Sequence, residues 1–166
     1  MSFAVVYWID VFVRELYCNL MIETLKFYQK ERLELFAYCI MPSHIHLIFR
    51  DKQNEPEKLL GNIKRYSSNK LQEEIVNNPQ ESRKEWMLWM MERAGAKSSN
   101  VNKRMFWQHH NKPIELWSKE VIMQKLNYVH QNPVESGFVP QAEYWKYSSA
   151  DNYFGGKGVI DVTLIY

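Results

Sequence analysis

Apolar residues along the chain follow two spacings, one typical of strands and one typical of helices. A β-branched and aromatic run at 3–10 indicates a first strand, and an imperfect apolar stripe predicts a helix over 15–31. Two further strands are indicated at 35–41 and 44–50. A Pro-Ser pair alone separates them, so we expect an antiparallel hairpin.

Longer helical patterns follow the hairpin. Apolar positions at helical spacing predict a helix over 57–77, and a shorter amphipathic helix follows at 81–94. The segment at 95–104 is polar and basic, and we interpret it as a loop.

The last third of the chain adds weaker strands and a third helix. Short-strand character occurs at 105–108 and 113–116. Ser118 is a favourable N-cap for a helix that reaches about Gln131, and we expect Pro133 to limit it. The order β-α-β-β-α-β with an additional helix predicts an α+β fold, a ferredoxin-like antiparallel sheet with helices packed on one face.

Length and composition favour a single globular domain. The chain has 166 residues, 46% hydrophobic and 24% charged, so we expect one domain over 1–166 with 134–166 as a C-terminal extension. No apolar run is long enough for a transmembrane helix. With only Cys18 and Cys39, and no secretory signal pattern at the start, we expect a cytoplasmic protein that does not contact membranes.

Few glycines are present, and this excludes several chemistries. None of the nucleotide-binding glycine motifs can be drawn through the 6 Gly residues. C-x-x-C and H-E-x-x-H patterns are also missing from the sequence, which argues against structural zinc and zinc proteases. The net charge of +2 is too small to indicate a nucleic-acid partner by itself.

Two pairs of residues have spacings suited to chemistry. His44 and His46 alternate on a predicted strand, so their side chains share a face about 7 Å apart and could converge on one ion. Tyr128 and Asn132 lie four residues apart on one face of a predicted helix. Tyrosine supplies an oxygen nucleophile and asparagine a neutral oxygen ligand. The alternatives are that both histidines are ordinary strand residues, that Tyr128 is simply one of the 10 tyrosines, and that Asn132 with Pro133 only caps the C-terminal end of the helix.

Longer motifs resemble a known family. The run YCIMPSHIHLI at 38–48 resembles the strand-turn-strand of the Y1-type HUH transposases. Further blocks resemble the branch associated with repetitive extragenic palindromes (REP), the REP-associated tyrosine transposases of the IS200-like family. They are FWQ at 106–108, LNYVHQNPV at 126–134, GFV at 137–139 and YSSA at 147–150.

The resemblance implies an HUH endonuclease fold and a role for each residue of the two pairs. His44 and His46 would bind a divalent metal ion, Mg²⁺ with Mn²⁺ as a substitute, and Asn132 would be the third ligand. Tyr128 would be the nucleophile. Insertion-sequence relatives more often carry glutamine at the third position, whereas Asn132 matches the palindrome-associated branch.

The implied activity is that of a metal-dependent transposase. It would nick and rejoin single-stranded DNA at palindromic, REP-like hairpins through a 5′-phosphotyrosine intermediate, in the prokaryotic cytoplasm and at the nucleoid. We leave open whether it acts as a monomer or a homodimer. One alternative is a catalytically inactive nucleic-acid-binding module with the same fold. Another is a metal-dependent hydrolase that acts through water and needs no tyrosine.

Residues that contact DNA are less clearly marked. Basic side chains on the second long helix and in the following loop could contact phosphates, or could simply form a solvated surface. They are Lys64, Arg65, Lys70, Lys97, Lys103 and Arg104. Trp86, Trp89 and Trp107 could stack on bases, although core packing is the more common role of such residues.

The other histidines are weaker candidates for catalysis or metal binding. His130 could be a base for Tyr128, but it lies on a different helical face. The adjacent His109 and His110 would diverge on a strand, so we do not assign them as ligands.

Overall fold

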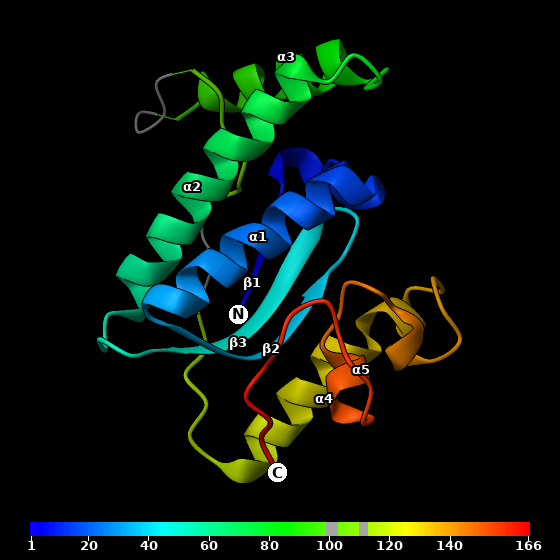
Figure 1. The fold of residues 1–166 in the computed structure, drawn as a ribbon. Coiled ribbons are helices and arrows are strands. Elements are labelled where there is room, and N and C mark those ends of the chain that lie inside the picture. The colour runs from blue at the N-terminus through cyan, green and yellow to red at the C-terminus, as the bar shows by residue number, and fades with distance from the viewer. Residues whose placement is uncertain (99–102, 110–112) are drawn as a thin grey trace.

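Three strands form one antiparallel sheet with β3 at its centre. The computed structural model describes residues 1–98, 103–109 and 113–166. Strands β1 (Ser2–Ala4) and β2 (Leu33–Ile40) flank β3 (His44–Asp51) in the order β1-β3-β2 (Figure 1). The tight turn predicted between the second and third strands is present, and Ile40 pairs with Ile45 just beyond it.

Helices α1 (Glu15–Glu31) and α2 (Pro56–Asn77) lie on one face of this sheet (Figure 1). Their apolar stripes pack against Ile45 and Leu47, which are fully buried. Both helices match their predicted ranges to within one residue. The predicted α+β fold with an antiparallel sheet is confirmed, and these two helices share one face of it as expected.

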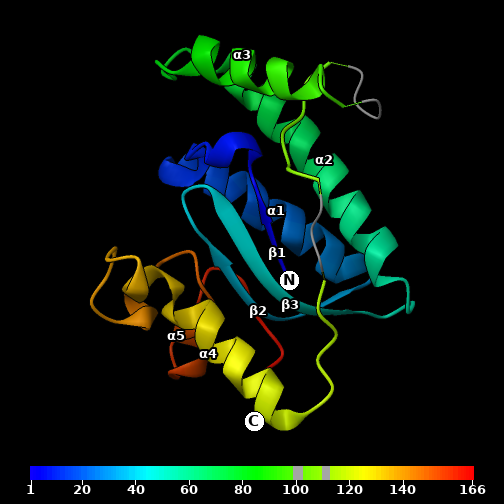
Figure 2. The same ribbon diagram turned by 180° about the vertical axis from the view of Figure 1, so that it is seen from behind.

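Helix α4 (Lys119–Glu135) lies on the other face and forms a third layer (Figure 2). Leu126 and Val129 of this helix are buried against the sheet in a second, smaller apolar cluster, which includes Ala37, Cys39, Met41 and Ile48. The face that carries His44 and His46 is therefore partly covered by the helix that carries Tyr128.

The chain after α4 follows the outer edge of β2. It contains the short helices η3 (Ala142–Tyr144) and α5 (Ala150–Tyr153). Backbone bonds from Ile40 N–H to Tyr147 O and from Thr163 N–H to Leu35 O, both 2.9 Å long, fix it to that edge. Helix α3 (Lys84–Gly95) packs against α2 on the opposite side of the molecule. Among the described residues, no helix is both long and apolar enough to cross a bilayer.

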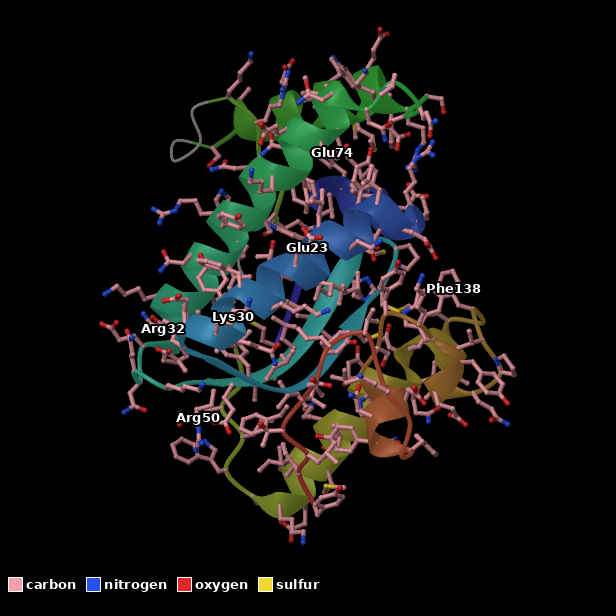
Figure 3. All side chains as sticks on the ribbon, in the orientation of Figure 1. Glu23, Lys30, Arg32, Arg50, Glu74 and Phe138 are labelled. Atoms are coloured by element: carbon pink, nitrogen blue, oxygen red, sulfur yellow. The ribbon has the colours of Figure 1, made fainter. Side chains whose placement is uncertain are left out.

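Side chains alternate along β3 as the sequence predicts. Asp51 is buried in an ion pair with Arg32, whose Nε lies 2.7 Å from Asp51 Oδ1. The adjacent Arg50 instead pairs with Glu34 on β2, at 2.8 Å from Nε to Oε2. Figure 3 shows Arg32 and Arg50 at the same end of the sheet, with Phe138 near the other end.

The prediction of a first strand over 3–10 is wrong beyond Ala4. The chain leaves the sheet there and forms two short 3₁₀ turns, η1 (Val6–Trp8) and η2 (Val11–Val13). Bonds from Val5 N–H to Ser43 O and from Phe12 N–H to Pro42 O, each 2.9 Å, wrap this segment around the β2-β3 turn. Tertiary hydrogen bonds thus override the strand propensity of the sequence.

Two further predictions need correction. The expected strand at 105–108 is reduced to an isolated bridge between Trp107 and Val5, and the described residues at 113–116 form no strand. The other correction concerns α4, which continues past Pro133. Proline removes one backbone N–H near the end of the helix, and a 3.0 Å bond from Ser136 N–H to Asn132 O closes the last turn.

Candidate active site

The two histidines of the H-x-H motif lie side by side on β3. Their ring centroids are 4.8 Å apart, with the planes nearly perpendicular. His46 is buried, with 5% of its surface exposed, whereas His44 is half-buried near the β2-β3 turn. The strand alternation predicted from the sequence therefore places both imidazoles on the face below α4.

Burial keeps both imidazoles neutral at physiological pH. It lowers the pKa of His46 to about 3, and the neighbouring His44 and the N-terminal ammonium group contribute to this lowering. Burial also lowers the pKa of His44. A neutral imidazole has a free nitrogen lone pair, which is the form that binds metal ions.

Helix α4 carries the other two residues to the same place. The Ser118 hydroxyl caps the helix by accepting a hydrogen bond from Val121 N–H at 3.3 Å. The ring of Tyr128 stands edge to face with that of His46, with centroids 5.4 Å apart. Asn132 is 9% exposed, and its side chain interacts with both imidazoles, which partly offsets the lowering of their pKa values. The structure thus brings together all four residues singled out in the sequence.

The donors at this site fit a divalent metal ion. Despite the nearby Asn132 side chain, His46 Nε2 is buried and lacks a partner with good hydrogen-bond geometry. His44 Nδ1 lies 3.3 Å from the Ser43 hydroxyl, a contact that helps to orient this ring. Two imidazole nitrogens and one amide oxygen are a suitable set for a cation that keeps further positions open. Within the described residues no group of three His, Cys, Asp or Glu could hold a metal ion, so a site here depends on the amide of Asn132.

A small cavity opens beside the tyrosine. Its volume is about 120 Å³, and its lining includes His46, Tyr128 and the apolar side chains of Ile114 and Leu116. Lys125 also lines it, with Nζ 6.0 Å from the centroid of the Tyr128 ring. The sequence analysis missed Lys125, although its position three residues before Tyr128 places both on one helical face.

His130 has a structural role. It is buried, and its Nε2 lies 2.9 Å from the hydroxyl of Ser149, which in turn donates to Tyr38 O at 3.3 Å. Its ring also packs on Tyr153. These contacts join α4 to the C-terminal segment and to β2, so they argue against His130 as the base for Tyr128.

Three of the basic residues suggested for DNA contact are engaged within the protein. The Lys64 ammonium donates to Gln108 O at 3.0 Å, and burial lowers the pKa of Lys64 to about 8. Ion pairs hold the other two: Arg104 with Glu92 at 2.8 Å, and Lys70 with Glu73 at 3.6 Å.

The remaining three candidates are exposed, as Lys70 also is. Arg65 donates to Asn62 Oδ1 at 3.1 Å on the surface of α2. Lys103 is exposed just before the segment that contains Phe106. The exposed Lys97 lies over the ring of Tyr7, with Nζ 5.9 Å from the centroid. Of these three residues, Lys97 therefore contacts an aromatic side chain of η1.

The tryptophans singled out in the sequence divide into one buried residue and two exposed residues. Trp107 is buried and donates to the Ser67 hydroxyl at 3.1 Å, so it belongs to the core. Trp86 and Trp89 are exposed on α3. The sequence analysis missed Trp8, which is 60% exposed and lies 5.4 Å from the His44 ring, centroid to centroid. His110 lies outside the described residues, as do 99–102 of the predicted loop.

Comparison with known proteins connects this site to a family. The family model described as "Transposase IS200 like" matches residues 5–105, more than half of the chain, including both histidines but ending before Tyr128. A Haemophilus influenzae protein, whose name describes it as a REP-associated tyrosine transposase, is 27% identical over 116 residues. The match covers 70% of this chain and spans only 58% of that relative's length.

The fold also matches a solved structure, that of a REP-associated tyrosine transposase bound to a REP hairpin. The TM-score is 0.63 at 16% identity, and the match covers 98% of this chain and 84% of the other. This likeness concerns the fold, and it extends across the part of the chain that carries Tyr128 and Asn132. The resemblance noted in the sequence is confirmed by these comparisons, and the chain belongs to the IS200-like transposase family.

Proposed function

We propose that this protein cuts and rejoins single-stranded DNA at REP-like hairpins, through a covalent bond between DNA and Tyr128. The observation that carries the proposal is the approach of the Tyr128 ring to a buried, neutral histidine pair, one of whose nitrogens has no partner. Family membership supports the class of reaction. The REP hairpin bound in the similar solved structure supports the class of substrate.

His44, His46 and Asn132 would hold the divalent ion, Mg²⁺ or Mn²⁺. When bound, such an ion supplies positive charge next to the scissile phosphate. The apolar contacts of α4 with the sheet hold Tyr128 in place, and Lys125 adds a cationic group on the same helical face. A phosphate that reached the cavity beside Tyr128 would meet the phenol and this lysine together.

The chemistry of the tyrosine conserves the energy of the phosphodiester. Tyr128 Oη gives up its proton and forms a bond to phosphorus, the bond from phosphorus to the 3′ oxygen of the preceding nucleotide breaks, and that oxygen takes up a proton, so no net proton is gained or lost. The products are a 5′-phosphotyrosine and a free 3′-OH. Attack by another 3′-OH reverses the step and rejoins strands. No nucleotide triphosphate is consumed, which agrees with the missing glycine-rich phosphate motif in the sequence.

A single chain supplies all four residues of the site. Tyr128 lies beside His46 of the same chain because α4 packs on its own β2 and β3. Single-stranded hairpin DNA is therefore the only macromolecular partner that the proposal requires, and a second copy of the chain is not needed to complete the site.

Labelled hairpin DNA tests the proposal. The protein would be incubated with Mg²⁺ or Mn²⁺ and REP-like hairpins from the genome that encodes it, labelled at the 5′ or the 3′ end. We expect an adduct that survives denaturation and retains the 3′ label, while the 5′-labelled fragment is released. Tyr128→Phe should form no adduct. If the hairpin is cleaved without an adduct, and Tyr128→Phe still cleaves it, the protein is a hydrolase. Tight binding without cleavage would indicate an inactive binding module.

A further inference from the structure

Two adjacent aromatic residues in η1 project from an otherwise buried segment. Tyr7 and Trp8 are 43% and 60% exposed, whereas their neighbours Val6 and Ile9 are buried. Both aromatic residues have positive φ angles, 53° and 56°, a region that residues with a Cβ rarely adopt. Such strain persists only where the surrounding structure enforces it, and it is frequent at functional sites.

The backbone around this pair is fixed to the turn that precedes the histidines. Val5 N–H donates to Ser43 O and Phe12 N–H donates to Pro42 O, each at 2.9 Å. Both acceptors belong to the two residues immediately before His44. The segment is therefore held at both ends against the turn that leads into the strand carrying the candidate metal ligands.

The side chains continue a row of rings that leads to the nucleophile. Centroid distances are 5.4 Å from Trp8 to His44, 4.8 Å from His44 to His46, and 5.4 Å from His46 to Tyr128. Trp8 stands at the end of this row opposite Tyr128. A strand of DNA whose phosphate lies at the histidines would have a neighbouring nucleotide within reach of the indole.

The charge near the pair suits a nucleotide. Lys97 is exposed, and its ammonium lies 5.9 Å from the centroid of the Tyr7 ring. An exposed aromatic surface beside a lysine combines the two features by which proteins bind single strands, base stacking and backbone neutralisation. Inside a duplex both faces of each base are covered by stacking on the neighbouring pairs, so this arrangement favours an unstacked, unpaired base.

We propose that Trp8, assisted by Tyr7, forms a stacking subsite for an unpaired nucleobase next to the phosphate that Tyr128 attacks, and that Lys97 contacts the backbone of that nucleotide. The inference deepens the proposed function and rests on it for the position of the phosphate. It assigns a role to η1, the segment in which the chain departs from the predicted strand.

The test compares binding of a base-bearing strand with binding of a strand without bases. The probes are dye-labelled dT12 and a 12-nucleotide abasic strand of equal charge, measured by fluorescence anisotropy in EDTA, so that no metal-dependent step contributes. The wild type should prefer dT12. Trp8→Ala should weaken dT12 binding by roughly 5- to 150-fold, the range for one stacked base, and leave abasic binding nearly unchanged.

Further variants separate stacking from other effects. Trp8→Phe should keep part of the preference, and Lys97→Gln should weaken both probes alike. Phe154→Ala is the control, because Phe154 is 66% exposed and follows α5 on the β2 side of the sheet. The inference is overturned if Trp8→Ala binds dT12 as the wild type does, or if it loses both probes equally. It is also overturned if the wild type shows no preference for dT12.

The inference and the proposed function can fail separately. If the wild type prefers dT12 through Trp8 but forms no covalent adduct with hairpin DNA, the stacking subsite is supported and the cleavage reaction is rejected. If the adduct forms while Trp8→Ala keeps the preference for dT12, the reaction is supported and the subsite is rejected.

Discussion

The ring of Tyr128 meets the buried imidazole of His46 edge to face, with centroids 5.4 Å apart, although one residue lies on α4 and the other on β3. Two apolar side chains of α4, Leu126 and Val129, determine this approach by packing against the sheet. The position of the nucleophile therefore depends on the small core between α4 and the sheet.

Metal binding should depend on the histidine pair and on the amide. We expect His46→Ala to abolish saturable Mn²⁺ binding in isothermal titration calorimetry. Asn132→Ala should weaken it by at least the roughly 10–100-fold typical of losing a supporting group around a metal. Tyr128→Phe is the matched control, because it leaves all three proposed ligands in place. Equal Mn²⁺ affinity in the wild type and in His46→Ala would contradict the assignment.

The same site should bind metal at unusually low pH. Protons and metal ions compete for an imidazole, and the pKa of His46 is lowered from 6.5 to about 3. His46 therefore stays neutral as the pH falls from 7 to 5. Mn²⁺ affinity should fall over that interval by much less than the roughly 25-fold expected for one histidine with a pKa near 6.5. Titrations at pH 5, 6 and 7 measure this, and a fall of roughly 25-fold or more would show that burial does not keep the histidine pair neutral.

Glu81 should be important for stability, with its full contribution above pH 4.5. It is buried and accepts hydrogen bonds from Arg14 Nε at 2.7 Å, Tyr17 Oη at 3.2 Å and Arg83 Nε at 3.1 Å. Burial raises the pKa of Glu81, but the bonds from Arg83 and Arg14 outweigh it and bring the value to about 2. Glu81→Gln should lower the free energy of unfolding by about 2 kcal/mol, a modest figure because both arginines are partly exposed.

The pH dependence of this effect has a definite sign. A carboxyl whose pKa falls from 4.5 to about 2 on folding contributes stability that is complete above pH 4.5 and is lost as the pH approaches 2. As the pH falls from 4.5 to 2, the free energy of unfolding measured in urea should therefore decrease less in Glu81→Gln than in the wild type. Glu73→Gln changes an exposed carboxylate that pairs with Lys70 at 3.6 Å, and it should have little effect. Identical pH profiles for Glu81→Gln and the wild type would be inconsistent with the prediction.

Relief of the strain at Trp8 should stabilise the fold. At φ +56° a glycine avoids the clash that any Cβ makes there. Trp8→Gly should be more stable than Trp8→Ala by about 1 kcal/mol in urea unfolding, while both lose the preference for dT12. Equal stability of the two variants would mean that the backbone at this position is not strained.

Local patterns in the sequence predict much of the site. Alternation on a strand places His44 beside His46, and helical spacing places Tyr128 with Asn132. Neither pattern states that α4 lies over the histidine face. That arrangement depends on apolar contacts of Leu126 and Val129 with strands far away in the sequence, and only the family resemblance predicted that the two pairs meet.

The features that were missed depend on long-range contacts. Residues 3–10 are rich in strand-forming types, and nothing local shows that Val5 donates to Ser43 O and leaves the sheet. Trp8 is exposed because the chain leaves the sheet at this point. Pro133 was expected to limit α4, but a proline near the end of a helix removes only one N–H, and the turn closes after it.

The most direct test of the proposed function is to identify the residue that becomes attached to DNA. The protein would be incubated with Mn²⁺ and its hairpin substrate, denatured, digested with nuclease and protease, and analysed by mass spectrometry. We predict a nucleotide joined through a 5′-phosphate to the peptide that contains Tyr128, and no such peptide when His46→Ala or Tyr128→Phe is used. Attachment to another tyrosine, or cleavage of the hairpin with Tyr128 unmodified, would contradict the proposed function.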